Sequence, residues 1–151
     1  MRVPDAFDRL IADMKRLEGR ARVGALDERN AEVLSFSEFG TVNEPPRPTL
    51  SAAFDQTEPA MRRAIDRKIG AVIDGKSEAG GRRILSEVGE DFAEVVREAI
   101  DSNVPPENAP STLAAKRRKG QGDRTLVATG EMRGSITVES KSDTKAWQDE
   151  E

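Results

Sequence analysis

Apolar residues recur every three or four positions over two long stretches, and this periodicity constrains the fold more than any other feature of the chain. The first stretch contains Leu50, Phe54, Met61, Ile65, Ile69, Val72 and Ile73. The second contains Ile84, Leu85, Val88, Phe92, Val95, Val96, Ala99 and Ile100. Such spacing places apolar side chains along one face of an α-helix. We therefore expect two long amphipathic helices that pack on each other or on a sheet.

Proline and glycine predict where these helices begin and end. Pro59 has no amide proton and fits best in the first turn of a helix, so Thr57 is the expected N-cap of a helix that runs to about Asp74, with a kink or fresh start at the cap. Gly75 is expected to end that helix in a left-handed conformation. Ser77 is then expected to cap the second helix, which runs to about Asp101.

The N-terminal region predicts one more helix and a strand. Helical spacing relates Phe7, Leu10, Ile11, Met14 and Leu17, with Asp5 as the N-cap and Gly19 as the stop. Residues 20–26 alternate small apolar side chains with arginine and glycine, as in a half-buried strand. Residues 27–30 are expected to form a turn. Residues 31–39, which Gly40 closes, fit either a short helix or a strand.

The C-terminal region predicts further strands. Residues 125–129 and 135–140 have strand character, and residues 129–134 are expected to turn between them. These strands would pair antiparallel with residues 20–26. We therefore expect an α+β fold, with a small antiparallel sheet of three or four strands packed with two or three amphipathic helices. Residues 1–140 would form one domain, followed by a polar, acidic tail over residues 141–151.

The composition predicts a thin core and excludes several kinds of chemistry. Charged residues make up 34% of the 151 residues and hydrophobic residues 36%, with five Phe, one Trp and no Tyr. A thin core makes burial against other subunits a source of stability. Because the chain has no Cys and no His, it has no disulfide, thiolate nucleophile or histidine base. No apolar run approaches the about 20 residues of a membrane span. We expect a protein made in the cytoplasm that acts as an assembly component.

Two proline-rich segments are expected to be irregular connectors that project from the fold. Residues 41–48 contain three prolines, which exclude a helix or a central strand. Arg47 lies between Pro46 and Pro48, so its guanidinium would be presented in a fixed direction. It either braces this connector or contacts another subunit. Residues 103–110 form the second connector.

Residues 70–77 match G-x-x-x-x-G-K-S, the phosphate-binding loop of nucleotide hydrolases. In that loop the lysine reaches the outer phosphate oxygens and the serine holds Mg²⁺. A buried apolar strand should precede the first glycine, yet residues 62–69 are charged and follow a helical period. A helix end at Gly75, with Lys76 at the negative end of the helix and Ser77 as the next cap, explains the same residues.

A basic segment follows the second connector. Ser111 is expected to cap a brief helix over residues 112–119, and five positive charges fall between residues 116 and 124. This segment is either a solvated loop or a surface that faces DNA or an acidic neighbour. No aromatic residue interrupts it, which disfavours base stacking. Trp147, in the polar tail, is either solvated or an anchor for a neighbouring subunit, and we favour the anchor.

Two motifs together resemble the tailed-phage tail-component family, the small neck or tail-completion proteins of the head-to-tail junction. The first is E-F-G-T at residues 38–41, followed by P-x-R-P-x-L, of which residues 46–50 are P-R-P-T-L. The second is P-x-T-x-x-x-K-x-G followed by T-G-x-L/M-R-x-S-I, which residues 109–136 resemble. The chain departs from the family pattern at Thr125, Ala128 and Met132, where the family has Pro, Asp and Leu. Met for Leu conserves volume.

The resemblance implies a structural protein with no catalytic residue and no cofactor. Copies would form a ring with a DNA channel, located in the virion between an adaptor or head-completion protein and the tail terminator or tail tube. Ring closure needs two different surfaces on each subunit. The alternatives are a nucleotide hydrolase and a nucleic-acid-binding regulator, the latter disfavoured by a net charge of −4. The expected interface residues are Glu38, Phe39, Thr41, Arg47, Pro48, Leu50, Lys116, Arg117, Arg118, Lys119, Arg124, Arg133 and Trp147.

Overall fold

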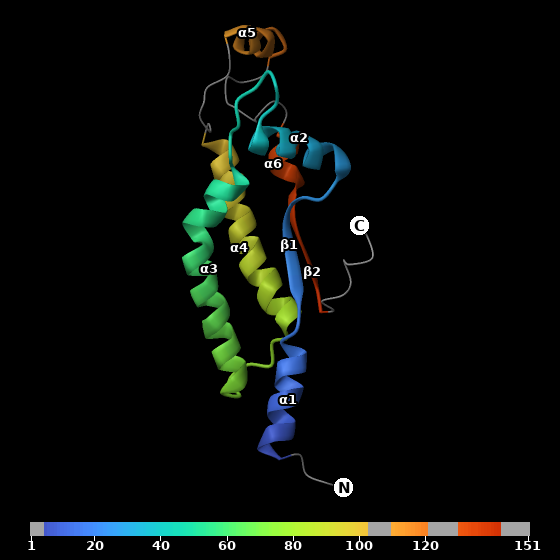
Figure 1. Ribbon diagram of the computed structural model, residues 1–151, viewed down its shortest axis with the longest axis vertical. Coiled ribbons are helices and arrows are strands. Elements are labelled where there is room, and N and C mark those ends of the chain that lie inside the picture. Colours follow the sequence, from blue (N-terminus) through green and yellow to red (C-terminus); the bar gives the residue numbers. More distant parts are fainter. Residues whose placement is uncertain (1–4, 103–109, 121–129, 143–151) are drawn as a thin grey trace. The chain divides into compact units, whose positions relative to one another are not determined.

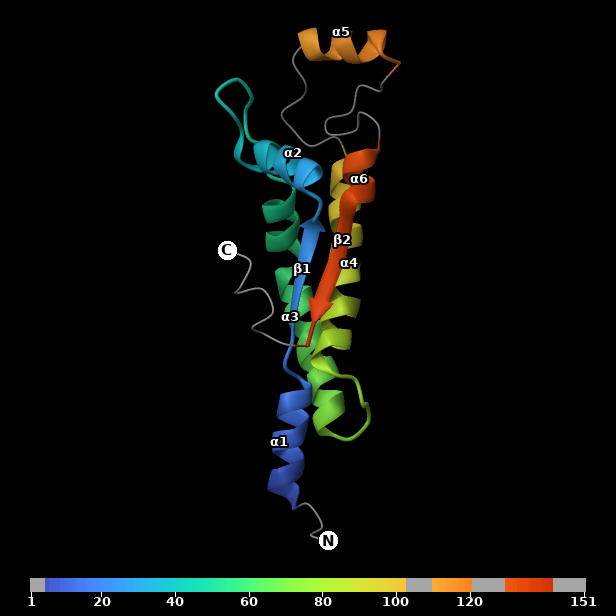
Figure 2. The ribbon, with the colours of Figure 1, turned by 90° about the vertical axis from the view of Figure 1, so that its right-hand side faces the viewer.

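The computed structural model describes residues 5–102, 110–120 and 130–142, and these residues form an α+β fold (Figure 1). The elements in chain order are α1 (Ala6–Arg16), β1 (Arg20–Ala25), α2 (Glu28–Phe39), α3 (Leu50–Ile73), α4 (Gly81–Asp101), α5 (Pro110–Arg118), α6 (Glu131–Ser135) and β2 (Ile136–Lys141). The strands β1 and β2 pair antiparallel (Figure 2). The predicted fold class is confirmed. The described residues contain two strands rather than three or four, and the predicted strand at residues 125–129 lies outside them.

The chain divides into two compact units. The first unit is drawn from residues 1–22, 59–90 and 138–151, and the second from residues 23–58 and 91–137. Both long helices and both strands therefore contribute to each unit. In the first unit the buried apolar side chains are Val72, Ile84 and Val88. In the second unit they are Ala25, Leu34, Ala53, Phe92, Ala93, Val96, Ile100, Met132 and Ile136.

The N-terminal helix and strand form as predicted. The Asp5 carboxylate accepts the backbone amides of Phe7 and Asp8, and the Asp8 carboxylate accepts the amide of Asp5 in return. This capping box satisfies amides that have no partner within the helix. After α1 the chain passes through Gly19 into β1. The expected turn at residues 27–30 is wrong, because Asp27 accepts the amide of Asn30 at 3.0 Å and so begins α2. Residues 31–39 are helical.

Helix α3 begins earlier than predicted and continues through Pro59. A fresh start at Thr57 is wrong: the Thr57 hydroxyl donates to the carbonyl of Ala53 over 2.6 Å, within a continuous helix. An internal proline costs a helix about 3 kcal/mol. Tertiary contacts hold the segment before it, since Ala53 is buried and the ring of Phe54 meets that of Phe92 edge-on at 6.0 Å.

The end of α3 confirms the prediction for Gly75. Gly75 has φ of 73°, its amide donates to the carbonyl of Val72, and the Lys76 amide donates to the carbonyl of Ala71. These two bonds define a Schellman motif. The predicted cap at Ser77 is wrong, because its hydroxyl accepts the amide of Ala79 and α4 begins only at Gly81.

Glycines permit a close backbone approach at the start of α4. A Cβ atom on Gly81 would lie 2.1 Å from the carbonyl oxygen of Leu17, and one on Gly19 would lie 3.1 Å from the amide nitrogen of Arg82. No side chain fits at that first distance. The segment that joins α1 to β1 therefore packs directly on the backbone at residues 80–82.

The remaining described elements follow the prediction in part. Pro110 is the first residue of α5, a position that suits its fixed φ, so the predicted cap at Ser111 is wrong. Residues 131–135 form the short helix α6 instead of a simple turn. Strand β2 forms within a residue of its predicted bounds. None of the helices within the described ranges is long and apolar enough to cross a membrane.

Candidate interaction site

An apolar groove lies in the second unit, where the end of β1, helix α2 and the first turns of α3 meet. Its volume is about 530 Å³. Phe92 of α4 also lines it. The principal apolar lining residues are Leu26, Leu34, Phe39, Leu50, Phe54 and Phe92. The predicted interface residues Glu38, Phe39 and Leu50 thus come together at one groove.

Large apolar side chains in this groove are open to solvent. The exposed fraction is 79% for Phe39, 48% for Phe54 and 39% for Leu26. Grouped apolar exposure of this kind marks interaction surfaces on soluble proteins, whereas single exposed residues do not. The groove is therefore the strongest candidate interaction site in the second unit.

Glu38 determines where α3 begins. Its carboxylate accepts the backbone amides of Thr49 at 2.8 Å, Leu50 at 3.0 Å and Ser51 at 2.9 Å, and also the hydroxyl of Ser51. The first amides of a helix have no partner within the helix, and a carboxylate there also suits the positive end of the helix dipole. Glu38 is only 9% exposed. Its role is therefore to fix the wall of the groove rather than to contact another molecule through its charge.

The connector between α2 and α3 is braced by its own backbone. Gly40 has φ of 76°, which favours glycine, and its amide donates to the carbonyl of Phe36. Thr41 and Glu44 exchange backbone hydrogen bonds, and the Thr41 hydroxyl accepts the Glu44 amide at 3.1 Å. The result is a closed loop between two helices that line the groove. Pro48 lies in this connector and is exposed.

Arg47 is a buried part of this connector. Its amide donates to the carbonyl of Ser37 over 2.6 Å, and its side chain is 9% exposed with Nη1 3.9 Å from a Glu44 carboxylate oxygen. The prediction of a connector that projects from the fold is wrong at Arg47, which is buried. Of the two predicted roles, the geometry favours bracing. The alternative, a subunit contact, would require the guanidinium to leave this environment.

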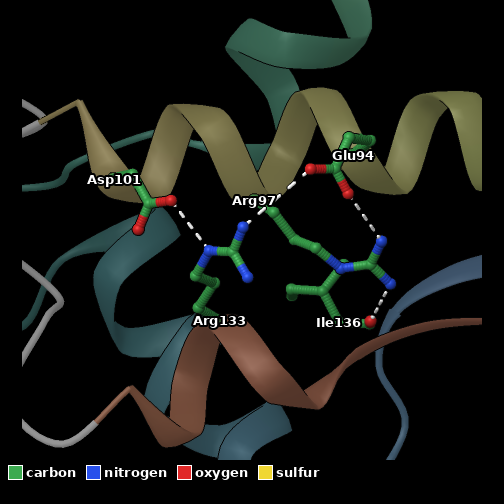
Figure 3. A network of polar contacts seen from close by, with 5 residues as sticks. All are labelled: Glu94, Arg97, Asp101, Arg133 and Ile136. Carbon is green, nitrogen blue, oxygen red and sulfur yellow. Dashed lines mark hydrogen bonds and ion pairs between the residues drawn. The ribbon is translucent and has the colours of Figure 1, made fainter.

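The second motif docks residues 130–136 on α4. Figure 3 shows Arg133 of α6 donating to the Asp101 carboxylate over 2.7 Å, with its Nη2 3.9 Å from Glu94. The hydrogen bond to Asp101 raises the pKa of Arg133 above its ordinary value. Arg97 donates to Glu94 over 3.0 Å and to the carbonyl of Ile136 over 2.7 Å. Arg133, predicted at an interface, therefore holds α6 to α4.

The two motifs meet in space. Helix α2, which carries Glu38, packs against α6, which carries Arg133 (Figure 1). Met132 and Ile136 are buried in the same unit. Residues nearly a hundred positions apart in the chain thus pack together in the second unit, and α2 among them also lines the groove.

The predicted basic surface is described in part. Lys116, Arg117 and Arg118 lie in the last turn of α5, followed by Lys119. Lys116 is half-buried, and the other three are exposed. Arg124 and Trp147 lie outside the described residues.

Residues 70–77 do not adopt the strand, loop and helix order that a phosphate-binding loop needs. Gly70 lies inside α3, and Lys76 pairs with Asp74 at 3.1 Å. Ser77 lines a polar cleft of about 390 Å³ together with Lys68, Arg83 and Glu87. Both cations in that cleft bind Glu87, at 2.5 and 2.9 Å. Within the described ranges no group of three or more acidic side chains is placed to hold a metal ion.

Helix α1 is a surface that the sequence predicted as a helix but not as a site. Phe7 and Met14 are 68% and 62% exposed, and Leu10 and Ile11 are 43% and 38% exposed. No residue of α1 is buried. The signal was present in the sequence, because a strongly amphipathic helix in a chain with a thin core needs an apolar partner. The sequence did not show that the described chain leaves this face uncovered.

Comparison of the chain with protein-family models, with curated proteins and with solved structures gives no match.

Proposed function

We propose that the protein is a structural subunit that assembles with copies of itself and with other proteins at the head-to-tail junction of a tailed phage. The observation that carries the proposal is uncovered apolar surface in both units. Phe7 on α1 is 68% exposed and Phe39 in the groove is 79% exposed. Exposed apolar patches on soluble domains mark surfaces that partners cover. The resemblance of two motifs to the tail-component family supports this kind of assembly.

Polar contacts in the second unit support this proposal. Glu38, Arg47 and Arg133 make hydrogen bonds or ion pairs within the second unit. Glu38 is buried and holds two helices that line the groove, so this groove is preorganised and binding costs less conformational entropy. The residues that resemble the family would thus hold a docking surface in shape, and the apolar side chains beside them would make the contacts.

Helix α5 supplies a second kind of surface. Three consecutive cations end the helix and Lys119 follows. Positive side chains bind phosphate groups without reading base sequence. In a ring through which the genome passes, this surface would meet DNA in the channel or an acidic neighbour. The other partners would be an adaptor or head-completion protein on one side and a tail terminator or tail tube protein on the other.

The proposal is tested by locating the protein in virions. Mass spectrometry of purified particles should detect it in several copies, and antibody labelling in electron micrographs should place it at the neck. Combined Lys116→Glu, Arg117→Glu and Arg118→Glu changes should lower the yield of complete virions while circular dichroism of the purified protein stays unchanged. If infected cells make the protein but purified virions lack it, the proposal is wrong.

A further inference from the structure

Helix α1 is short, and its apolar face is uncovered within the described residues. It has 11 residues, and isolated helices shorter than about 12–15 residues are marginal. Its N-terminal capping box is complete, so no further local contact can be added there. The apolar face carries Phe7, Leu10, Ile11 and Met14, all exposed. A surface that covers this face would therefore stabilise the helix.

The groove of the second unit has the properties of that surface. A helix of 11 residues is about 16 Å long and presents its apolar side chains in two or three turns. The groove is open and apolar, and its walls are two helices and a strand end. Recognition of an amphipathic helix by an apolar groove is a common mode of protein association.

Lys15 of α1 and two carboxylates beside the groove have opposite charges. Lys15 lies one turn after Ile11 at the border of the apolar face, and within the described ranges it makes no ion pair. Asp55 lines the groove, and Glu32 lies on α2 close to Ser35, which also lines it. Both carboxylates are exposed and, within the same ranges, unpaired. Opposite charges at the rim of an interface favour one orientation of the partner.

The chain itself favours a second copy as the partner. Within the described residues Phe7 of α1 is 68% exposed and Phe39 of the groove is 79% exposed, so neither apolar surface is covered by the chain that carries it. A second copy presents a groove to α1 and a helix to the groove, so one kind of partner covers both surfaces.

We propose that α1 of one subunit occupies the groove of the next subunit, with Phe7, Leu10, Ile11 and Met14 against Phe39, Leu50 and Phe54. The contact joins two different surfaces, so it repeats from subunit to subunit and closes into a ring when the rotation permits. This inference rests on the proposed function and names the contact that builds the ring.

Disulfide trapping tests the contact directly, because the natural chain has no cysteine. Met14→Cys protein and Phe39→Cys protein are purified separately, mixed in equal amounts and oxidised. The mixture should give a cross-linked dimer at least about tenfold faster than either protein alone, because only the mixture places a thiol on each surface. A Val42→Cys protein, whose thiol lies in the connector outside the groove lining, is the control partner for Met14→Cys. Equal rates for the groove and control partners overturn the inference.

Charge insertion tests whether the contact builds the oligomer. Met14→Asp and Phe39→Asp should each weaken self-association at least about thirtyfold, as expected at the centre of an interface. Ala12→Asp places the same charge on the polar face of α1 and should leave assembly unchanged. All three variants alter exposed side chains, so their circular dichroism spectra should match that of the wild type.

A mixture of the two charge variants gives the sharpest result. Each Met14→Asp subunit keeps a working groove and each Phe39→Asp subunit keeps a working helix, so the mixture should form dimers and nothing larger. Native mass spectrometry reads this outcome. Wild-type protein that stays monomeric at about 100 μM, or variants that assemble like wild type, overturn the inference. Presence or absence in virions decides the proposed function independently.

Discussion

The carboxylate of Glu38 accepts the backbone amide of Thr49 over 2.8 Å, so the last turn of α2 caps the first turn of α3. Both helices form walls of the apolar groove. Because one buried carboxylate holds both walls, the shape of the groove depends on a contact that local sequence preference does not specify.

Removal of this cap should be costly. Glu38→Ala leaves the amides of Thr49, Leu50 and Ser51 without their acceptor, and we expect a loss of about 3 kcal/mol in the free energy of unfolding. Urea denaturation measures it. Glu32→Ala, an exposed change on the same helix, should stay within about 0.5 kcal/mol of wild type. Similar values for the two variants would contradict the capping role.

Two glycines give opposite expectations for the same substitution. Gly81→Ala places a Cβ 2.1 Å from the carbonyl oxygen of Leu17, so the backbone must shift and stability should fall by about 2 kcal/mol. Gly70→Ala meets no atom within 4 Å inside α3 and should raise stability by about 0.5–1 kcal/mol. Thermal unfolding of both variants checks the pair. Stabilisation by Gly81→Ala would show that residues 17–19 do not pack there.

These examples separate what could be predicted from the sequence from what could not. The cap at Asp5 and the left-handed residue at Gly75 depend on neighbours within a few positions, and both were predicted. The start of α3 depends on Glu38 and the start of α4 on the packing of Leu17, contacts between segments distant in the chain. Local rules therefore placed both starts at the nearest Thr or Ser.

The candidate site shows the same division. Motif matching selected Glu38, Phe39 and Leu50, which do line the groove. Phe54 and Phe92 were predicted only as members of helix stripes, because periodicity identifies an apolar face but not what covers it. Arg47 and Arg133 were expected at an interface, and the structure gives each of them contacts within its own unit.

Replacement of Ser37 by alanine should stabilise the protein. Its hydroxyl is buried and makes no hydrogen bond within the described residues. A buried, unpaired polar group is unfavourable, and alanine has the higher helix propensity. Ser37→Ala should therefore raise the free energy of unfolding by about 0.5–1 kcal/mol in urea denaturation. Ser35→Ala, an exposed change in the same helix, should gain only the smaller stabilisation that comes from helix propensity. A loss of stability in Ser37→Ala would show that the hydroxyl has a partner.

Glu87 should show a pKa below its ordinary value. The hydrogen bond from Lys68 is the largest cause, followed by that from Arg83. Because the folded carboxyl binds its proton less tightly than the unfolded one, its contribution to stability is present above the unfolded pKa and is lost as pH falls through the folded pKa. A carbon NMR titration measures the pKa directly. Lys68→Met should raise the pKa of Glu87. Arg67→Met, which replaces the exposed side chain next to Lys68, should not.

Arg97 should contribute more to stability than an exposed arginine. Its side chain is 21% exposed, and it donates to the carbonyl of Ile136 over 2.7 Å where the chain leaves α6 for β2. Arg97→Met keeps the aliphatic volume but leaves that buried residue's carbonyl without this donor, so we expect a loss of about 1–2 kcal/mol.

Comparison variants separate the carbonyl bond from the ion pair with Glu94. Glu94→Gln should cost clearly less than Arg97→Met, because ion pairs of exposed carboxylates contribute about 0–1 kcal/mol. Arg63→Met, an exposed change on α3, should stay within about 0.5 kcal/mol of wild type. If Arg97→Met and Glu94→Gln lose equal stability in urea, the ion pair with Glu94 rather than the bond to the Ile136 carbonyl accounts for the contribution of Arg97.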